Sequence, residues 1–181
     1  TEVRVIFEDG RMYEANIIGS DRLTDIGLVK IVASNLIPIS IGNSDKMLVG
    51  DLAVAIGHPL TLGAAPTVTT GVVSALERRL DVGGDLMGSS VTLFGLIQTD
   101  APITRGSSGG ALINKNGELI GITTAIATAD VGAEGLGFAV PINLALNIAE
   151  DLIKDGKILH AFLGILGAQH FDTAEDGARI F

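Results

Sequence analysis

The chain has 181 residues, a net charge of −9 and no cysteine, so disulfides and thiolate metal sites are excluded. No segment clusters Lys or Arg with aromatic residues, which argues against nucleic acid as a partner. The longest apolar stretch, Ile158–Ala168, is shorter than the roughly 20 residues of a transmembrane helix, so no membrane segment is expected in this chain.

The first part of the chain predicts a β-hairpin, a third strand and a linker. Thr1–Phe7 is rich in Val, Ile and Phe, and Met12–Ile18 runs back after Asp9-Gly10, a dipeptide favoured in type I′ turns. Ile26–Val32 predicts the next strand. The loose stretch Ser34–Met47, with its proline, glycine and asparagines, is the predicted linker between two lobes.

The second part of the chain consists of short β-branched segments bounded by Gly, Pro or Asn. Glu77–Ser90 lacks any period and is rich in Gly, Asp and Ser, which predicts a long exposed loop. Asn116-Gly117 marks a tight hairpin. The predicted strands are Leu52–Ile56, Thr67–Ala75, Leu93–Thr99, Ala111–Ile113, Glu118–Thr124 and Gly137–Val140.

One helix is predicted, with Pro141 at its first position and Gly156 just past its end. Many short strands with a single helix predict an all-β barrel or sandwich rather than an α/β fold. The apolar stripe of the helix is predicted to comprise Ile142, Ala145, Leu146, Ala149, Leu152 and Ile153.

The segment Thr104–Leu112 contains two serines among three glycines, directly before an apolar strand. One interpretation is an ordinary Gly/Ser turn; a Walker A phosphate loop is excluded because no Lys follows the glycines. The other is a nucleophile turn, in which Gly109 and Gly110 let the chain bend behind an exposed Ser108. The backbone N–H groups of Gly106 and Ser108 would then form an oxyanion hole for a tetrahedral intermediate.

This segment and several others resemble, in the same order, the HtrA (high-temperature-requirement A) type of trypsin-like serine protease. The resemblance extends from Val3 to about Ile165. The matching segments are Asp21–Lys30, Gly50–Pro59, Thr70–Ser74, Gln98–Leu112, Asn116–Ile122 and Gly135–Pro141.

By resemblance, the fold is the double β-barrel of chymotrypsin- and trypsin-like enzymes, with an incomplete first barrel. Residues 1–39 would belong to the first barrel, 40–48 to the inter-barrel linker, and 49–140 to the second barrel. Residues 141–161 would form the C-terminal helix and its exit, and 162–181 a linker with the start of a truncated PDZ domain.

The resemblance also implies roles for individual residues. It makes Ser108 the nucleophile, with Ser107 as the second choice, and Asp25 the triad acid; by itself, Asp25 would be read as an ordinary loop or strand-edge carboxylate. It implies no cofactor and no metal. The residues that fall where the family builds its substrate pocket are Ile103, Ile122, Thr124 and Phe138.

A serine hydroxyl needs an adjacent base, and the family's histidine is expected upstream of the first strand of this chain. The histidines present are His58, His160 and His170, and these are expected to be turn, surface or linker residues. A chain of these residues alone is therefore expected to be inactive.

The implied function of the parent protein is endopeptidase cleavage of unfolded or misfolded proteins in the cell envelope or periplasm, by acyl-enzyme chemistry on Ser108. A homo-oligomer is possible, since the family forms trimers. The alternative is a catalytically inactive, protease-like module that binds peptides or serves as a scaffold.

Overall fold

A computed structural model describes residues 2–58, 65–82, 91–104, 106–126 and 136–161, together with the short segments 167–169 and 178–180. Strands dominate these residues, and they contain a single α-helix, which confirms the all-β prediction. None of the helices in these ranges is long and apolar enough to cross a membrane.

The first lobe is an antiparallel sheet of β1 (Val3–Ile6), β2 (Met12–Asp21) and β3 (Ile26–Ile31), in that order. The hairpin between β1 and β2 is confirmed, but its predicted type I′ turn is wrong. Within the loop only Gly10 has a positive φ, +83°, whereas type I′ requires two such residues. The N–H of Phe7 donates to the carbonyl of Arg11, so the loop is one residue longer.

The second lobe is a closed barrel in the order β4-β5-β6-β9-β8-β7. Its strands are β4 (Leu52–Gly57), β5 (Thr67–Val82), β6 (Val91–Thr99), β7 (Ala111–Ile113), β8 (Leu119–Ile126) and β9 (Gly137–Pro141). Aliphatic side chains fill its interior, as expected for a chain without tryptophan. This core comprises Met47, Ala53, Ala55, Val73, Ile97, Ala101, Ile103, Leu112, Ile120 and Ala139.

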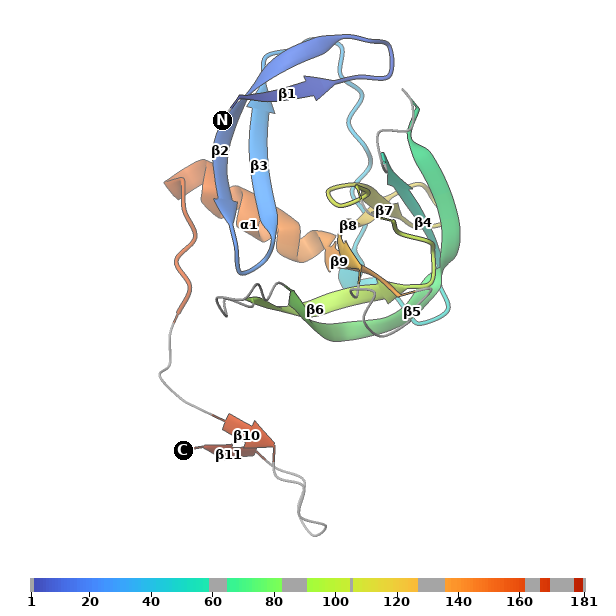
Figure 1. Ribbon diagram of the computed structural model, residues 1–181, viewed down its shortest axis with the longest axis vertical. Coiled ribbons are helices and arrows are strands. Elements are labelled where there is room, and N and C mark those ends of the chain that lie inside the picture. Colours follow the sequence, from blue (N-terminus) through green and yellow to red (C-terminus); the bar gives the residue numbers. More distant parts are fainter. Residues whose placement is uncertain are drawn as a thin grey trace.

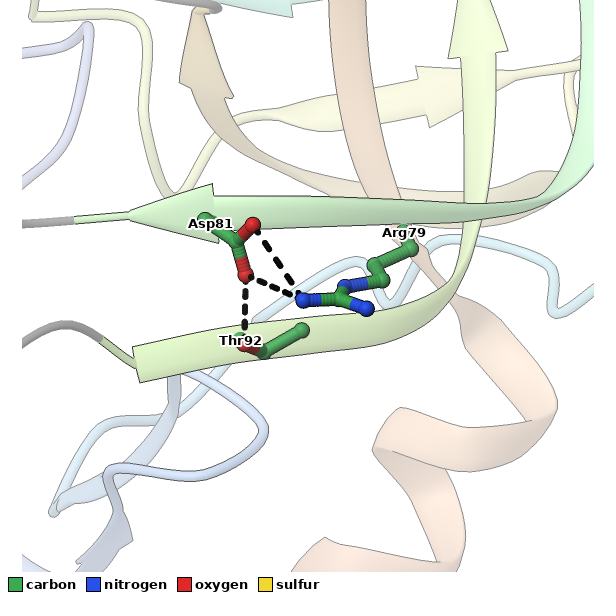
Figure 2. Close-up of polar contacts among 3 residues, drawn as sticks. All are labelled: Arg79, Asp81 and Thr92. Atoms are coloured by element: carbon green, nitrogen blue, oxygen red, sulfur yellow. Dashed lines mark hydrogen bonds and ion pairs between the residues drawn. The ribbon is translucent and has the colours of Figure 1, made fainter. Parts of the chain in front are cut away.

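The predicted exposed loop at Glu77–Ser90 is wrong in its first part, because β5 continues to Val82. The register with β6 shifts on both sides of a bulge, where Glu77 has φ +54°, and this breaks the alternation that marks a strand. Beyond the bulge, Asp81 accepts hydrogen bonds from Thr92 at 2.5 Å and from Arg79 at 3.3 Å (Figure 2). Residues 83–90 of the predicted loop lie outside the described residues.

The helix α1 (Ile142–Asp155) begins one residue later than predicted, with Pro141 as its N-cap and as the last residue of β9. Gly156 ends it in the left-handed conformation, as predicted, with φ +69°. The predicted apolar stripe is partly wrong, since Leu146 and Ile153 are 37% and 70% exposed. The buried face consists of Ile142, Ala145, Ile148 and Leu152.

The helix connects the two lobes, as it packs against β2 and β3 on one side and against β8 and β9 on the other (Figure 1). Gly19 of β2 permits this contact, because a Cβ there would lie 2.8 Å from Leu152 Cδ2. The shared core comprises Ile26, Leu93, Leu96, Leu119, Phe138, Val140, Ile142, Ala145, Ile148 and Leu152.

Outside these two lobes, a few of the described residues form short elements. The predicted linker 40–48 contains the short 3-10 helix η1 (Ser44–Lys46). Within 162–181, β10 (Gly167–Gln169) pairs with β11 (Ala178–Ile180). The assignment of 162–181 to the start of a PDZ domain, like the other domain boundaries, stays a prediction.

Candidate active site

The bend before β7 presents Ser108 to the solvent. Ser108 is exposed, whereas its neighbour Ser107 is half-buried. The N–H of Ser107 donates to the carbonyl of Thr104 at 3.0 Å, and the N–H of Gly110 donates to the carbonyl of Ser107 at 3.0 Å. These two turns reverse the chain on either side of the Ser108 hydroxyl.

Glycine is required at this bend for two different reasons. Gly106 and Gly109 have φ values of +96° and +85°, which residues with a Cβ rarely adopt. At Gly110, a Cβ would lie 2.3 Å from the carbonyl oxygen of Ile56 in β4. The first two glycines therefore set the path of the chain, and the third lets the bend approach the barrel wall.

Thr123 of β8 anchors the bend to the barrel. Its carbonyl accepts from the N–H of Gly109 at 2.7 Å, and its own N–H donates to the carbonyl of Gly110 at 2.9 Å. Its hydroxyl donates to the carbonyl of Ser107 at 2.5 Å. Because the Thr123 side chain is buried, these bonds are shielded from water and hold Ser108 in a fixed position.

Thr124, the next residue of β8, brings Ser108 and Asp25 together. The Ser108 hydroxyl donates to the Thr124 carbonyl at 2.5 Å, and the Thr124 hydroxyl donates to the Asp25 carboxylate. Thr124 is only 3% exposed. The two predicted catalytic side chains, which come from different lobes, therefore meet at a single residue.

Asp25 ends the turn between β2 and β3 and has the left-handed φ of +58°, which Asp tolerates better than most residues. Its side chain is exposed apart from the contact with Thr124. The sequence offers no local signal for this contact, because Asp25 and Thr124 are 99 positions apart. Thr124 was expected only as a substrate-pocket residue.

The predicted oxyanion donors lie on the same bend. Among the described residues, the backbone N–H groups of Gly106 and Ser108 have no hydrogen-bond acceptor. The neighbouring N–H groups of Ser107, Gly109 and Gly110 are all bonded to carbonyl oxygens of the chain. Two donors on either side of Ser107 thus have unused capacity for an oxygen atom of another molecule.

The other predicted pocket residues are buried or half-buried. Ile103 and Phe138 are buried, and Ile103 packs so closely on Gly137 that a Cβ there would lie 2.6 Å from its Cδ1. Ile122 is half-buried on β8. Side chains of residues 125–135, which follow Thr124, lie outside the described residues, so the substrate-pocket assignment stays a prediction.

Ser107, the second choice for the nucleophile, faces a different environment. A Cβ on Gly57 would lie 2.8 Å from the Ser107 Cβ, and Ser107 borders a cavity of about 50 Å³ between the bend and β4. Within the described residues, its backbone N–H and carbonyl make hydrogen bonds, whereas its hydroxyl makes none. These positions favour Ser108 over Ser107 as the group that meets a substrate.

None of the histidines in the described ranges contacts this site through a hydrogen bond. His58 is exposed after β4, and the Nε2 atom of His160 lies 2.7 Å from the Oδ1 atom of Asp21. His170 lies outside the described residues. The same ranges hold no cluster of three or more His, Cys, Asp or Glu side chains suited to a metal ion.

Comparison with known proteins identifies the same type of domain. Residues 1–122 match the family model described as a trypsin-like peptidase domain. The periplasmic pH-dependent serine endoprotease DegQ of Escherichia coli (strain K12) is 48% identical over 169 residues, which cover 93% of this chain and 35% of that protein. The serine protease PepD of Mycobacterium tuberculosis is 45% identical over 184 residues, 97% of this chain and 39% of that protein. The chain thus spans little more than a third of the length of these relatives.

Solved structures agree with these sequence matches. The HtrA-type protease AlgW with a decapeptide superposes with a TM-score of 0.82 at 36% identity, covering 99% of this chain and 55% of that chain. A serine endoprotease from Yersinia pestis gives a TM-score of 0.74 at 40% identity, covering 92% of this chain and 54% of that chain.

Proposed function

Because the chain belongs to the trypsin-like peptidase family, as a domain of the HtrA type, we propose that the protein containing it is a serine endopeptidase that uses Ser108 as its nucleophile. The observation that carries this proposal is the meeting of Ser108 and Asp25 at Thr124. The N–H groups of Gly106 and Ser108, which have no acceptor among the described residues, support it, since acyl transfer needs donors for the developing oxyanion.

In the proposed reaction, the Ser108 hydroxyl leaves the Thr124 carbonyl and its oxygen attacks the carbonyl carbon of a peptide bond. A base takes the hydroxyl proton, and the Gly106 and Ser108 N–H groups bind the oxyanion. The base returns the proton to the leaving amine as the carbon–nitrogen bond breaks, which leaves an acyl group on Ser108. Water then releases the acid by the same sequence.

The base is expected to be a histidine from outside these 181 residues. Within the described part of the chain, neither His58 nor His160 makes a hydrogen bond to Ser108 or Asp25. We therefore expect the 181-residue chain by itself to be inactive, because a triad acts as a unit and loss of one member typically costs several orders of magnitude.

Unfolded or misfolded proteins are the proposed substrates, and the periplasm or cell envelope is the proposed location. Curated relatives are named as periplasmic endoproteases, and the AlgW structures hold peptides. A homo-oligomer, with the trimer of the family as its form, is part of the same proposal. The second candidate function is an inactive, protease-like module that binds peptides.

Labelling of the full-length protein with a fluorophosphonate tests the proposal, because this reagent reacts with activated serines. We expect one adduct, on Ser108, that disappears in Ser108→Ala and persists in Ser107→Ala, the matched control one residue away. The 181-residue chain should label far more slowly. A full-length protein that binds unfolded peptides but forms no Ser108-dependent adduct would support the inactive module instead.

A further inference from the structure

Asp21 and His160 join two segments that are 139 positions apart in the sequence. Asp21 is the last residue of β2 and its side chain is 9% exposed, whereas the His160 side chain, on the segment after α1, is 38% exposed. Nε2 of His160 lies 2.7 Å from Oδ1 of Asp21. The pair therefore ties the exit of the helix to the turn between β2 and β3.

The other carboxylate oxygen of Asp21 shapes that turn. Oδ2 accepts from the backbone N–H of Thr24 at 3.0 Å and from the Thr24 hydroxyl at 2.6 Å. Asp21 and Ile26 are the last paired residues of β2 and β3, so the turn consists of residues 22–25. One buried carboxylate thus fixes the residue immediately before Asp25.

Asp21 stays ionised over the range in which histidine changes charge. Burial raises the pKa of Asp21, but the hydrogen bonds from Thr24 and His160 lower it, and the net result lies below the ordinary value of 3.8. Imidazole side chains in general gain a proton between about pH 8 and pH 5. A protonated His160 ring would form an ion pair with Asp21, whereas a neutral ring would form a hydrogen bond with it.

The described residues that line the pocket beside the His160 ring include no other titratable group. The ring borders a largely apolar pocket of about 280 Å³, whose walls include Leu23 and Thr24 from the turn, Thr92 and Phe94 from β6, Val140 from β9 and Leu144 from α1. The nearest charged residues in sequence are Arg22, beside Asp21, and Lys157 after α1, and both are exposed. Asp21 is therefore the charged partner of the ring.

We propose that Asp21 and His160 are a positioning pair for Asp25, and that protonation of His160 sets how firmly they hold its turn. The inference rests on the proposed function, in which Asp25 orients the catalytic base. When the ring is charged, the ion pair holds the turn and Asp25 keeps its contact with Thr124. When the ring loses its proton, the turn loosens. The pair touches no substrate and acts only through Asp25.

The test is the pH dependence of kcat/KM for peptide cleavage by the full-length protein and its variants, expressed as the ratio of variant to wild type. His160→Arg carries a permanent charge, His160→Gln is a neutral donor, and His58→Gln is the matched control at an exposed histidine. Since partly exposed ion pairs are weak, we expect changes of about 1.5- to 5-fold. The kcat/KM of His160→Arg relative to wild type should rise from pH 5.5 to pH 8, and that of His160→Gln should be lowest at pH 5.5. The ratio for His58→Gln should not change with pH.

Hydrogen exchange at the Thr24 amide gives a readout that does not depend on activity. At one fixed pH near 6, exchange should be faster in His160→Gln than in wild type or His58→Gln. If wild-type Ser108 is labelled but the kcat/KM ratios of both His160 variants do not change with pH, the positioning role is wrong and the proposed function stands. Failure of wild-type Ser108 to be labelled would overturn the proposed function, and the positioning role with it.

Discussion

Thr124 contributes both its side chain and its backbone to the candidate site, and one substitution separates the two. Thr124→Val removes the hydroxyl that donates to Asp25 and leaves the carbonyl that accepts from Ser108. Since a misplacement of about 1 Å can cost about 100-fold, we expect kcat/KM of the full-length protein to fall by about 10- to 100-fold. Thr124→Ser keeps the hydroxyl and should recover most of the activity. Equal losses in both variants, measured by steady-state kinetics, would contradict this role.

The Asp21 carboxyl group predicts a particular dependence of stability on pH. A carboxyl group with a lowered pKa in the folded state stabilises the fold above its ordinary pKa, and this contribution disappears as pH falls through the folded value. The difference in free energy of unfolding between wild type and Asp21→Asn should therefore be largest above about pH 5 and shrink below about pH 4. Urea unfolding at pH 3, 4 and 6 measures it. A difference that stays constant down to pH 3 would argue against the prediction.

The glycines that follow Ser108 are expected to differ in their tolerance of a methyl group. Gly110→Ala places a Cβ against the carbonyl oxygens of Ile56 and Ser107, and overpacking of this kind costs about 1–3 kcal/mol or more. Gly109→Ala meets open space and carries only the strain of a positive φ, about 1 kcal/mol. Denaturant unfolding should rank Gly110→Ala as the less stable variant. The reverse order would show that the backbone conformation matters more than the contact with β4.

At the scale of elements, the sequence predicted strands where short β-branched segments are bounded by Gly, Pro or Asn. It failed at the end of β5, where the bulge at Glu77 breaks the alternation and the charged residues Arg79 and Asp81 mimic a loop. These two charged side chains bond to each other along β5, and Asp81 also accepts from Thr92 of β6. The residue pattern of β5 carries no information about Thr92, which lies on the neighbouring strand β6.

The buried face of α1 was rotated relative to the prediction, and a pair of adjacent residues tests the corrected face. Leu152 is fully buried against Gly19, whereas Ile153 is 70% exposed. Loss of a buried leucine typically costs about 2–5 kcal/mol, so Leu152→Ala should be strongly destabilised and Ile153→Ala nearly unchanged. Thermal or urea unfolding of the two variants distinguishes them. Similar losses of stability in both variants would support the predicted stripe, which includes both residues.

At the scale of the whole molecule, α1 is the element through which the two lobes share a core. Ile148 and Leu152 belong to the same buried cluster as Ile26 of β3 and Leu96 of β6. Removal of residues 142–181 should therefore deprotect the amides of β2 and β3 in hydrogen exchange, while β4–β7 retain protection through the closed barrel. Uniform loss of protection in both lobes would show that they fold as one cooperative unit.

The sequence could predict those parts of the candidate site that lie within one local segment. The composition of the glycine-rich bend around Ser108 left two interpretations open, and the resemblance to a family favoured the nucleophile turn. The same resemblance pointed to the segment around Asp25. The contacts made by Thr123, Thr124 and His160 were not predictable, because each joins positions that only the folded barrel and helix bring together. Long-range pairing of this kind leaves no periodic signal in the sequence.

The carbonyl oxygen of Thr124 accepts a hydrogen bond from the Ser108 hydroxyl in this structure. An extended peptide whose amide N–H donated to that oxygen would compete with the Ser108 hydroxyl for it. Binding of such a peptide would therefore favour release of the Ser108 hydroxyl from Thr124. A ligand too short to reach the oxygen would leave the hydroxyl bonded to it.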